Sequence, residues 1–290
     1  MNLIKPKNLK KGDNIAIIAP AGEVEKPLIE KARAYFQSQE FNVFLGKNIF
    51  KSKNYLAGSD EERLEDLHWA FLNPEIDGII CARGGYGSIR LINKINYDII
   101  KNNPKIFCGY SDITALSAMI FKNAGLITYS GAMAQSDFSK TEIDEFTQNE
   151  FWKALIDDNY SIEFDNKKIY RHGLVQGNLI AGNLATFASL SGIDFIPDEK
   201  FVFMTEDINE PVYKIDKYFR QLLNTDKFRN NLSGILLGDF VGVDNEQWLN
   251  DLWTELAQEL EIPIASGFSI SHGASKSTVP YGIDIQYNIL

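Results

Sequence analysis

The segment 106–114 (Ile-Phe-Cys-Gly-Tyr-Ser-Asp-Ile-Thr) holds a serine where it could act as a nucleophile. A short apolar run ends in a glycine, Ser111 follows two residues later, and apolar residues with helical spacing begin at Ile113. This pattern predicts a strand, a tight turn and a helix, with the Ser111 hydroxyl projecting from the turn. Unpaired N–H groups and the helix dipole at such a turn would stabilise a developing negative charge.

The same serine also fits a purely structural role. Serine is a favoured N-cap residue, and Ser111 followed by Asp112 would begin a helix in the ordinary way. The surrounding sequence departs from the G-x-S-x-G pattern of α/β-hydrolases, because Ile113 stands where the second glycine would be. Evidence for catalysis therefore has to come from other parts of the chain.

A nucleophilic serine needs a base, and the chain has 3 histidines. His68 shares a helical face with Leu64 and Phe71, which favours a packing role. His172 lies in a turn before a predicted strand and fits a surface position. His272 lies in a loop of mostly small residues, which leaves its imidazole room to meet a substrate, although a solvated loop histidine fits the same pattern.

A carboxylate that orients the imidazole would complete a catalytic triad. In the predicted strand that ends at Glu206, alternation puts this residue on the same face as Val202 and Met204. An acid on an apolar face is unfavourable without a partner, whereas an acid past the strand end could simply reach solvent. Ser111, Glu206 and His272 follow one another in the order nucleophile, acid, base, which α/β-hydrolases share.

Residues 83–88 (Arg-Gly-Gly-Tyr-Gly-Ser) form a glycine-rich loop after another predicted strand. Neither G-x-x-x-x-G-K-S/T nor G-x-G-x-x-G occurs, which disfavours a nucleotide-phosphate loop. A plain tight turn fits the residues. So does an oxyanion and substrate loop, in which glycines let backbone N–H groups approach a carbonyl oxygen and Arg83 pairs with a carboxylate. No His and Cys residues have metal-ligand spacing, which argues against a metal site.

The composition is ordinary for a globular protein, with 44% hydrophobic and 23% charged residues among 290. The net charge of -10 argues against a nucleic-acid partner, which requires a basic face. No apolar run approaches the ~20 residues that span a bilayer, and the first residues do not resemble a signal peptide, so we expect a cytoplasmic protein without membrane contact. Cys81 and Cys108 lie in apolar runs and are expected to be buried, reduced thiols.

Strands alternate with helical patterns through the first half of the chain, which predicts an α/β domain with a parallel, doubly wound sheet. The predicted strands cover residues 14–19, 41–45, 77–82 and 106–109, and a capping box opens a helix at Ser59. Both candidate loops follow strands of this sheet, at the edge where ligands bind in such folds. We expect this amino-terminal domain to span 1–150, a linker 151–165, and a smaller mixed α+β domain 166–290.

Several short segments together resemble the LD-carboxypeptidase family, serine peptidases that trim muropeptides. They are Gly12-Asp13 with 18–22 (Ile-Ala-Pro-Ala-Gly), 82–87 (Ala-Arg-Gly-Gly-Tyr-Gly), 109–114 (Gly-Tyr-Ser-Asp-Ile-Thr), 182–184 (Gly-Asn-Leu), 206–207 (Glu-Asp) followed by 210–211 (Glu-Pro) and 213–216 (Tyr-Lys-Ile-Asp), and 267–268 (Gly-Phe) leading to His272-Gly273. Each segment alone is weak, but in this order they span nearly the whole chain. Ser271 departs from the family, which usually has glycine there.

The resemblance implies a flavodoxin-like amino-terminal domain, a smaller carboxy-terminal domain, and a site between them. It implies that Ser111 is the nucleophile, His272 the base, and Glu206 the acid that orients the base. It further implies an oxyanion hole built from the backbone N–H groups of Gly85 and Asp112.

The implied reaction is hydrolysis of the bond between an L-configured centre and a terminal D-alanine, which in peptidoglycan recycling turns a muropeptide tetrapeptide into a tripeptide. Arg83 is the candidate for binding the terminal carboxylate and Tyr86 for a further substrate contact, and no cofactor is needed. One alternative is hydrolysis of a microcin C-type peptidyl-nucleotide for self-immunity, although the aromatic residues single out no adenine platform. Another is a non-catalytic muropeptide-binding protein. The preferred diamino acid and the formation of a homodimer remain open.

Overall fold

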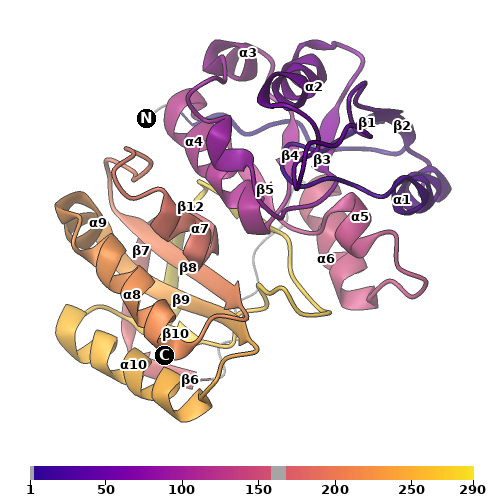
Figure 1. Ribbon diagram of the computed structural model, residues 1–290. Helices are drawn as coiled ribbons and strands as arrows, with labels where there is room; N and C mark the ends of the chain where they lie inside the picture. Colours follow the sequence, from indigo (N-terminus) through magenta and orange to yellow (C-terminus); the bar gives the residue numbers. More distant parts are fainter. Residues whose placement is uncertain (1–2, 158–167) are drawn as a thin grey trace.

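The computed structural model describes residues 3–157 and 168–290, which form two β-sheets with helices packed on them (Figure 1). The amino-terminal sheet has the strand order β11-β5-β4-β3-β1-β2, and its neighbouring strands are parallel except for β11, which runs antiparallel to β5. Its strands are β1 (Asn14–Ile18), β2 (Asn42–Leu45), β3 (Gly78–Cys81), β4 (Ile106–Cys108), β5 (Thr128–Ser130) and β11 (Val279–Tyr281).

Six α-helices and two short 3₁₀ helices belong to this part of the described chain: α1 (Lys26–Ser38), α2 (Asp60–Leu72), η1 (Ser88–Arg90), α3 (Tyr97–Asn102), η2 (Ser111–Ile113), α4 (Thr114–Ala124), α5 (Ala134–Asp137) and α6 (Glu145–Ile156). The predicted capping box at the start of α2 is confirmed. The Ser59 hydroxyl accepts a hydrogen bond from the Glu62 backbone N–H, and the Glu62 carboxylate accepts one from the Ser59 N–H.

The second sheet has the order β12-β7-β8-β9-β10-β6, in which β7, β8, β9 and β10 are parallel and the two edge strands are antiparallel. Its strands are β6 (Lys168–Arg171), β7 (Gly173–Asn183), β8 (Phe201–Ile208), β9 (Leu232–Val241), β10 (Ile264–Ser266) and β12 (Asp284–Ile289). The accompanying helices are α7 (Leu184–Ser189), α8 (Val212–Leu223), α9 (Asp226–Asn231) and α10 (Glu246–Leu260). The prediction of an α/β fold in two parts is confirmed.

Two strands of the second sheet run further than the sequence predicts. β7 continues past Ile180 to Asn183, and β8 continues past Thr205 to Ile208. The parallel pairing explains the extension, because it continues until Asn183 is aligned with Glu206. These two polar residues therefore lie side by side where the paired strands end.

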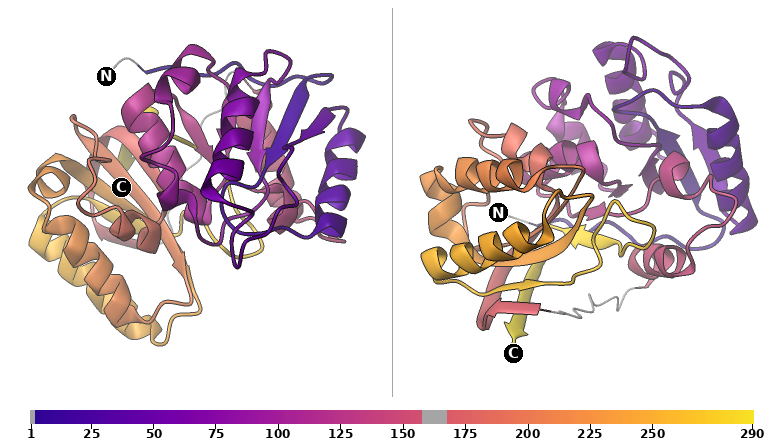
Figure 2. Two further views of the ribbon diagram at one scale, coloured as in Figure 1. Left: turned by 45° about the horizontal axis from the view of Figure 1, so that its top comes forward. Right: turned by 60° about the horizontal axis from the view of Figure 1, so that its bottom comes forward.

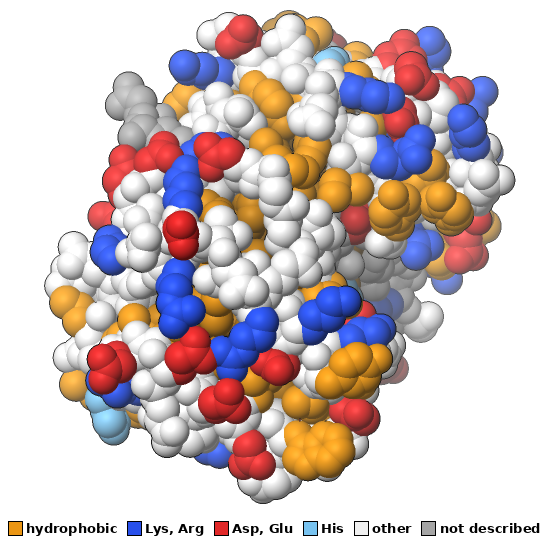
Figure 3. Space-filling view, turned by 60° about the vertical axis from the view of Figure 1, so that its left-hand side comes forward, with side chains coloured by type: hydrophobic (Ala, Val, Ile, Leu, Met, Phe, Trp, Pro, Cys, Tyr) orange, Lys and Arg blue, Asp and Glu red, His pale blue; other side chains and the backbone are white. Residues whose placement is uncertain are grey.

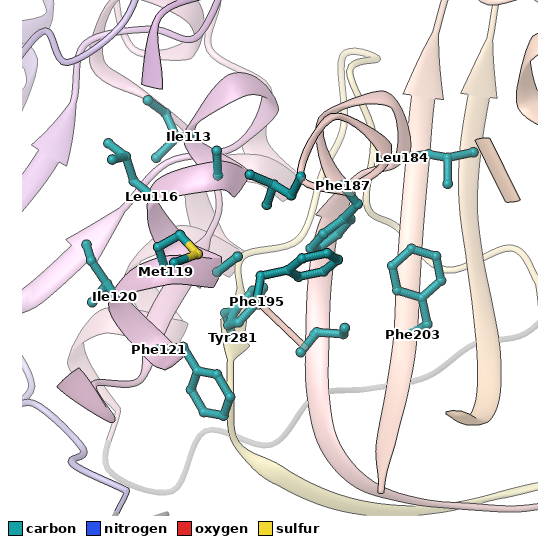
Figure 4. Packing of buried hydrophobic residues seen from close by; sticks show 14 of the residues in the cluster. Ile113, Leu116, Met119, Ile120, Phe121, Leu184, Phe187, Phe195, Phe203 and Tyr281 are labelled. Atoms are coloured by element: carbon teal, nitrogen blue, oxygen red, sulfur yellow. The ribbon is translucent and has the colours of Figure 1, made fainter. Parts of the chain in front are cut away.

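The two sheets share an apolar core at the junction of the parts (Figure 4). Leu116 and Met119 of α4 belong to the same buried cluster as Phe187 of α7. At the edge of this cluster the Asn183 backbone N–H donates to the Thr114 hydroxyl over 3.1 Å. A Cβ atom on Gly182 would lie 2.5 Å from that hydroxyl, so only glycine permits so close an approach.

The segment after β10 also joins the two parts. In Figures 1 and 2 the yellow segment that follows β10 reaches across to the purple amino-terminal part. There Val279 pairs with Ser130 and Tyr281 with Thr128, which makes β11 the edge strand of the amino-terminal sheet. The loop between β10 and β11 is thus anchored in a different sheet at each end.

Helix α6 packs on the amino-terminal part. Trp152 stacks on Phe41 with ring centroids 4.7 Å apart, and Phe151 contacts Phe138 edge-on. The end of α6 falls within the segment 151–165 that is predicted as a linker, and residues 158–165 of that segment lie outside the described residues. The boundaries of the three predicted regions remain a prediction.

Charge is spread over the surface of the carboxy-terminal helices. On the face shown in Figure 3, basic and acidic side chains are interleaved. The ion pairs of Arg220 with Asp216 and Glu255 are of this kind. Within the described ranges 3–157 and 168–290, no helix has both the length and the apolar character to cross a membrane.

Candidate active site

Ser111 lies in a strained turn directly after β4. Its φ angle is +64°, in the left-handed region that non-glycine residues seldom occupy and that costs of order 1–3 kcal/mol. Its side chain makes no capping hydrogen bond to η2 or α4 within the described chain, so the interpretation of Ser111 as an ordinary N-cap is wrong. A Cβ atom on Gly84 would lie 2.7 Å from Ser111 Cβ, which shows how closely the glycine-rich loop approaches the serine.

Glu206 and His272 form a close pair. Glu206 is 3% exposed at the end of β8, and its Oε2 lies 2.6 Å from His272 Nδ1. Val202 and Met204 are buried in one apolar cluster, whereas Phe203 is buried in another, which confirms the predicted alternation of β8. The alternative that Glu206 reaches solvent is wrong. A hydrogen on Nδ1 donated to the carboxylate leaves Nε2 free to accept a proton.

Asn183 supports this pair from the neighbouring strand. Its side-chain amide donates to Asp207 Oδ1 over 2.9 Å and to Glu206 Oε1 over 3.4 Å. Asp207 in turn accepts a hydrogen bond from the Ala185 backbone N–H over 2.8 Å, and burial raises its pKa to about 6. Asn183 and Asp207 belong to segments that resemble the family, but only the pairing of β7 with β8 places the Asn183 amide beside Glu206.

His272 also lies beside the serine turn. Its ring meets the ring of Tyr110, the residue before Ser111, edge-on with centroids 5.0 Å apart. Among the described residues we find no hydrogen bond between Ser111 Oγ and His272 Nε2. Catalytic hydrogen bonds often tighten only once substrate is bound. The structure thus brings the three predicted residues to one place, from two different parts of the chain.

The loop that carries His272 is fastened to the amino-terminal part. The Lys276 ammonium lies 2.7 Å from Asp137 Oδ1, and both side chains are 3% exposed. The residue before Lys276 makes a second contact, in which the Ser275 hydroxyl donates to Asp144 over 2.9 Å. No local sequence pattern indicates these contacts, because each joins residues more than 100 positions apart, 139 for Lys276 and Asp137 and 131 for Ser275 and Asp144.

The glycine-rich loop lies next to the serine turn. Gly85 has a φ of +106°, and neither its backbone N–H nor that of Asp112 donates to another described residue. The Asp112 carboxylate is engaged elsewhere, since its Oδ2 accepts the Ser88 backbone N–H over 2.8 Å. Two backbone donors are therefore free in the part of the structure that is described, close to the serine hydroxyl.

A cavity of about 580 Å³ opens beside this loop, lined by Gly22, Glu23, Tyr55, Arg83, Gly85 and Tyr86. Arg83 donates to the Glu23 backbone carbonyl over 3.3 Å. Tyr86 is 46% exposed, and its ring meets that of Tyr55 edge-on with centroids 5.6 Å apart. The two predicted substrate-binding residues therefore both line this cavity. A slightly larger hollow, of about 680 Å³, is lined by none of the predicted site residues.

The other two histidines and the two cysteines make none of the contacts described for this site. His68 Nε2 accepts a hydrogen bond from the Asn96 backbone N–H, and burial lowers the pKa of this histidine, as expected for a packing role. His172 is exposed between β6 and β7. Cys81 and Cys108 are buried free thiols, which confirms that prediction. Over residues 3–157 and 168–290 no three His, Cys, Asp or Glu side chains are grouped as metal ligands.

Comparison with known proteins agrees with the resemblance. Family models described as the LD-carboxypeptidase N-terminal domain and C-terminal domain match residues 15–131 and 176–287. A probable murein peptide carboxypeptidase of Bacillus subtilis is 36% identical over 98% of this chain and 91% of the relative. A murein tetrapeptide carboxypeptidase of Pseudomonas aeruginosa is 28% identical over 92% of this chain and 91% of the relative.

Solved structures give the same result. The muramoyltetrapeptide carboxypeptidase of Oxalobacter formigenes superposes with a TM-score of 0.84 at 28% identity, covering 94% of both chains. The microcin self-immunity protein MccF in complex with aspartyl sulfamoyl adenosine superposes with a TM-score of 0.89 at 25% identity, covering 98% of this chain and 95% of the other. The match of both family models, together with the sequence identity to the Bacillus subtilis relative, shows that the chain belongs to the LD-carboxypeptidase family of peptidases.

Proposed function

We propose that the protein is a serine carboxypeptidase that releases the terminal D-alanine from muropeptide tetrapeptides by hydrolysing the bond to the preceding L-configured centre. The observation that carries the proposal is the buried contact of 2.6 Å between Glu206 and His272, placed beside the strained Ser111 turn. The names of the relatives, which are murein peptide and murein tetrapeptide carboxypeptidases, support this substrate class.

In the proposed reaction Ser111 Oγ attacks the scissile carbonyl carbon while His272 Nε2 accepts the hydroxyl proton. Glu206 stabilises the imidazolium that forms. The negative charge on the carbonyl oxygen is met by the free backbone N–H groups of Gly85 and Asp112. The C–N bond then breaks, His272 returns the proton to the amine of the departing D-alanine, and water hydrolyses the acyl-enzyme by the same steps.

Substrate binding is assigned to the cavity beside Gly85. The Arg83 guanidinium lines this cavity and is the proposed partner of the terminal carboxylate, which it could bind through two parallel hydrogen bonds. The exposed ring of Tyr86 offers an apolar surface to the rest of the peptide. Replacing Arg83 by Gln should therefore raise KM more than it lowers kcat.

The test is D-alanine release from a muropeptide tetrapeptide, followed by mass spectrometry. Ser111→Ala and His272→Asn should each lower the rate on the order of 10⁴-fold. His172→Asn is the matched control, because His172 is exposed and precedes β7, whose far end carries Asn183, so the rate of this variant should be unchanged. A Ser111→Ala enzyme with near-normal turnover would refute the assignment of the nucleophile.

A second candidate function is hydrolysis of a peptidyl-nucleotide. The structure adds one observation in its favour, namely that Tyr55 and Tyr86 form an exposed aromatic pair at the cavity, on which a base could stack. MccF, which was solved in complex with aspartyl sulfamoyl adenosine, is structurally similar to the chain. Cleavage of a peptidyl-adenylate with an unchanged tetrapeptide would favour this function. Binding of a tetrapeptide without any turnover, and without fluorophosphonate labelling of Ser111, would indicate a non-catalytic binding protein.

A further inference from the structure

A fully buried arginine binds the loop that carries Gly85. The Arg63 side chain, in the first turn of α2, is 0% exposed. Its Nη1 donates to the backbone carbonyls of Pro20 over 2.6 Å and of Gly87 over 2.9 Å. Its Nη2 donates to Asp60 over 2.6 Å, so the charge is paired. One side chain thus bridges the loop after β1 and the loop after β3.

The fit around this guanidinium is tight. Gly87 has a φ of +134°, and a Cβ atom there would lie 2.7 Å from Arg63 Nη1. Burial lowers the pKa of Arg63, and the paired Asp60 carboxylate opposes that effect. Burying a guanidinium is unfavourable unless its hydrogen bonds are made. Arg63 makes three through Nη1 and Nη2, two of them to loop carbonyls, whereas its buried Nε has no partner in the described part of the chain.

Two further contacts fasten the same loop. The Gly84 carbonyl accepts the Gly22 backbone N–H over 3.1 Å, and the Ser88 backbone N–H donates to the Asp112 carboxylate over 2.8 Å. Together with the bond from Arg63 to the Gly87 carbonyl, they hold the loop on both sides of Gly85. Asp112 belongs to the serine turn, so the two proposed oxyanion donors are tied to one another.

We propose that Arg63 is a positioning residue that fixes the Gly85 N–H against Ser111, so that the oxyanion hole is formed before substrate arrives. The inference rests on the proposed function, in which Gly85 and Asp112 stabilise the oxyanion. Arg63 touches no substrate in this scheme and acts only through the loop. Its loss should therefore weaken stabilisation of a tetrahedral centre at Ser111 and leave ground-state binding largely intact.

The experiment measures the second-order rate at which a fluorophosphonate probe labels Ser111, since phosphonylation builds charge in the same hole whatever the natural substrate is. Removing an oxyanion donor outright costs about 10²–10³-fold, so a loosened donor in Arg63→Ala should slow labelling roughly 10- to 100-fold. Millimolar methylguanidinium should restore part of that rate. The labelling rate of Arg63→Lys should lie between those of wild type and Arg63→Ala, because one ammonium cannot replace both guanidinium nitrogens.

The matched control is Arg90→Gln. The Arg90 side chain also binds Asp60, with its Nε 2.7 Å from Oδ1, but contacts neither loop carbonyl and is 42% exposed. The Arg90 backbone N–H donates to the Gly87 carbonyl over 3.1 Å, a bond that the substitution leaves in place, so the variant should be labelled at the wild-type rate. Circular dichroism and thermal unfolding show which variants are folded. If Arg63→Ala is not folded, Arg63→Lys serves as the test. A folded Arg63 variant labelled as fast as wild type would overturn the inference. Wild-type protein that is not labelled at Ser111 would overturn the proposed function, and the inference with it.

Discussion

Breaking the buried ion pair between Lys276 and Asp137, which joins the His272 loop to the amino-terminal part, should strongly destabilise the fold, because it leaves one charge buried without its partner. Both side chains are 3% exposed, and removing one partner of such a pair typically costs about 3–5 kcal/mol. In Lys276→Met the Asp137 carboxylate keeps the Met133 backbone N–H at 2.9 Å and Lys140 at 3.7 Å. We therefore expect Lys276→Met to lower the free energy of unfolding by about 3 kcal/mol, the lower end of that range.

Removing Asp137 should lower the free energy of unfolding more than removing Lys276. In Asp137→Leu the Lys276 ammonium keeps the Tyr110 ring, whose centroid is 5.0 Å away, but loses its carboxylate, so we expect about 4–5 kcal/mol. The double variant leaves no unpaired buried charge and loses mainly the bond from the Met133 N–H, so its free energy of unfolding should lie within about 1–2 kcal/mol of wild type. The two substitutions should therefore be strongly non-additive.

The assay is guanidinium chloride unfolding followed by tryptophan fluorescence and circular dichroism, with coincident transitions required before free energies are compared. Lys11→Met removes the exposed pair between Lys11 and Glu40, whose side chains are 70% and 65% exposed, and should leave stability unchanged. The reasoning is refuted if Lys276→Met costs less than about 1 kcal/mol, or if the two single effects simply add in the double variant.

Three other features give shorter tests. Gly84→Ala would place a methyl carbon 2.7 Å from Ser111 Cβ and 2.9 Å from its Oγ, so D-alanine release should fall roughly 100-fold in a folded protein. Normal turnover would contradict the close approach of Gly84 to Ser111. Burial raises the pKa of Asp207 from 3.8 to about 6, so the folded state holds a proton that the unfolded state has released. The free energy of unfolding, relative to Asp207→Asn, should therefore fall as the pH rises from about 4 to about 6, and urea titrations that show a constant difference would exclude this linkage. Burial also raises the pKa of Cys81 and Cys108, so neither thiol should react with an aromatic disulfide reagent until denaturant is added; rapid reaction of the native protein would contradict their burial.

The features that the sequence predicted well are those set by local patterns. The turn at Ser111 follows from an apolar run, a glycine and a helical period, all within 15 residues or so. The alternation in β8 placed Glu206 on the same face as Val202 and Met204, where a buried acid needs a partner, and His272 supplies it. In both cases the neighbouring residues restrict where the side chain can point.

The features that the sequence did not predict depend on distant contacts. Lys276 and Asp137 are separated by 139 positions, and a lysine and an aspartate in polar segments are ordinarily exposed. Arg63 is surrounded by acidic residues in the sequence of α2, a setting typical of an exposed charge, yet its partners include the carbonyls of two remote loops. Such contacts follow from the packing of whole elements, which no local period encodes.

The position of β11 has a consequence for the order in which the chain can fold. The amino-terminal sheet receives its last strand from residues 279–281, and the other sheet receives an edge strand from residues 284–289. During synthesis, β5 therefore leaves the ribosome long before its partner β11. One row of its N–H and C=O groups stays unpaired while almost the whole second part is made. An open strand edge is prone to pair with other chains, so both sheets should be protected from aggregation only after this segment has been made. Cutting the gene between the two sheets would leave β5 without its edge partner in the first product, and β11 without the strand it pairs with in the second.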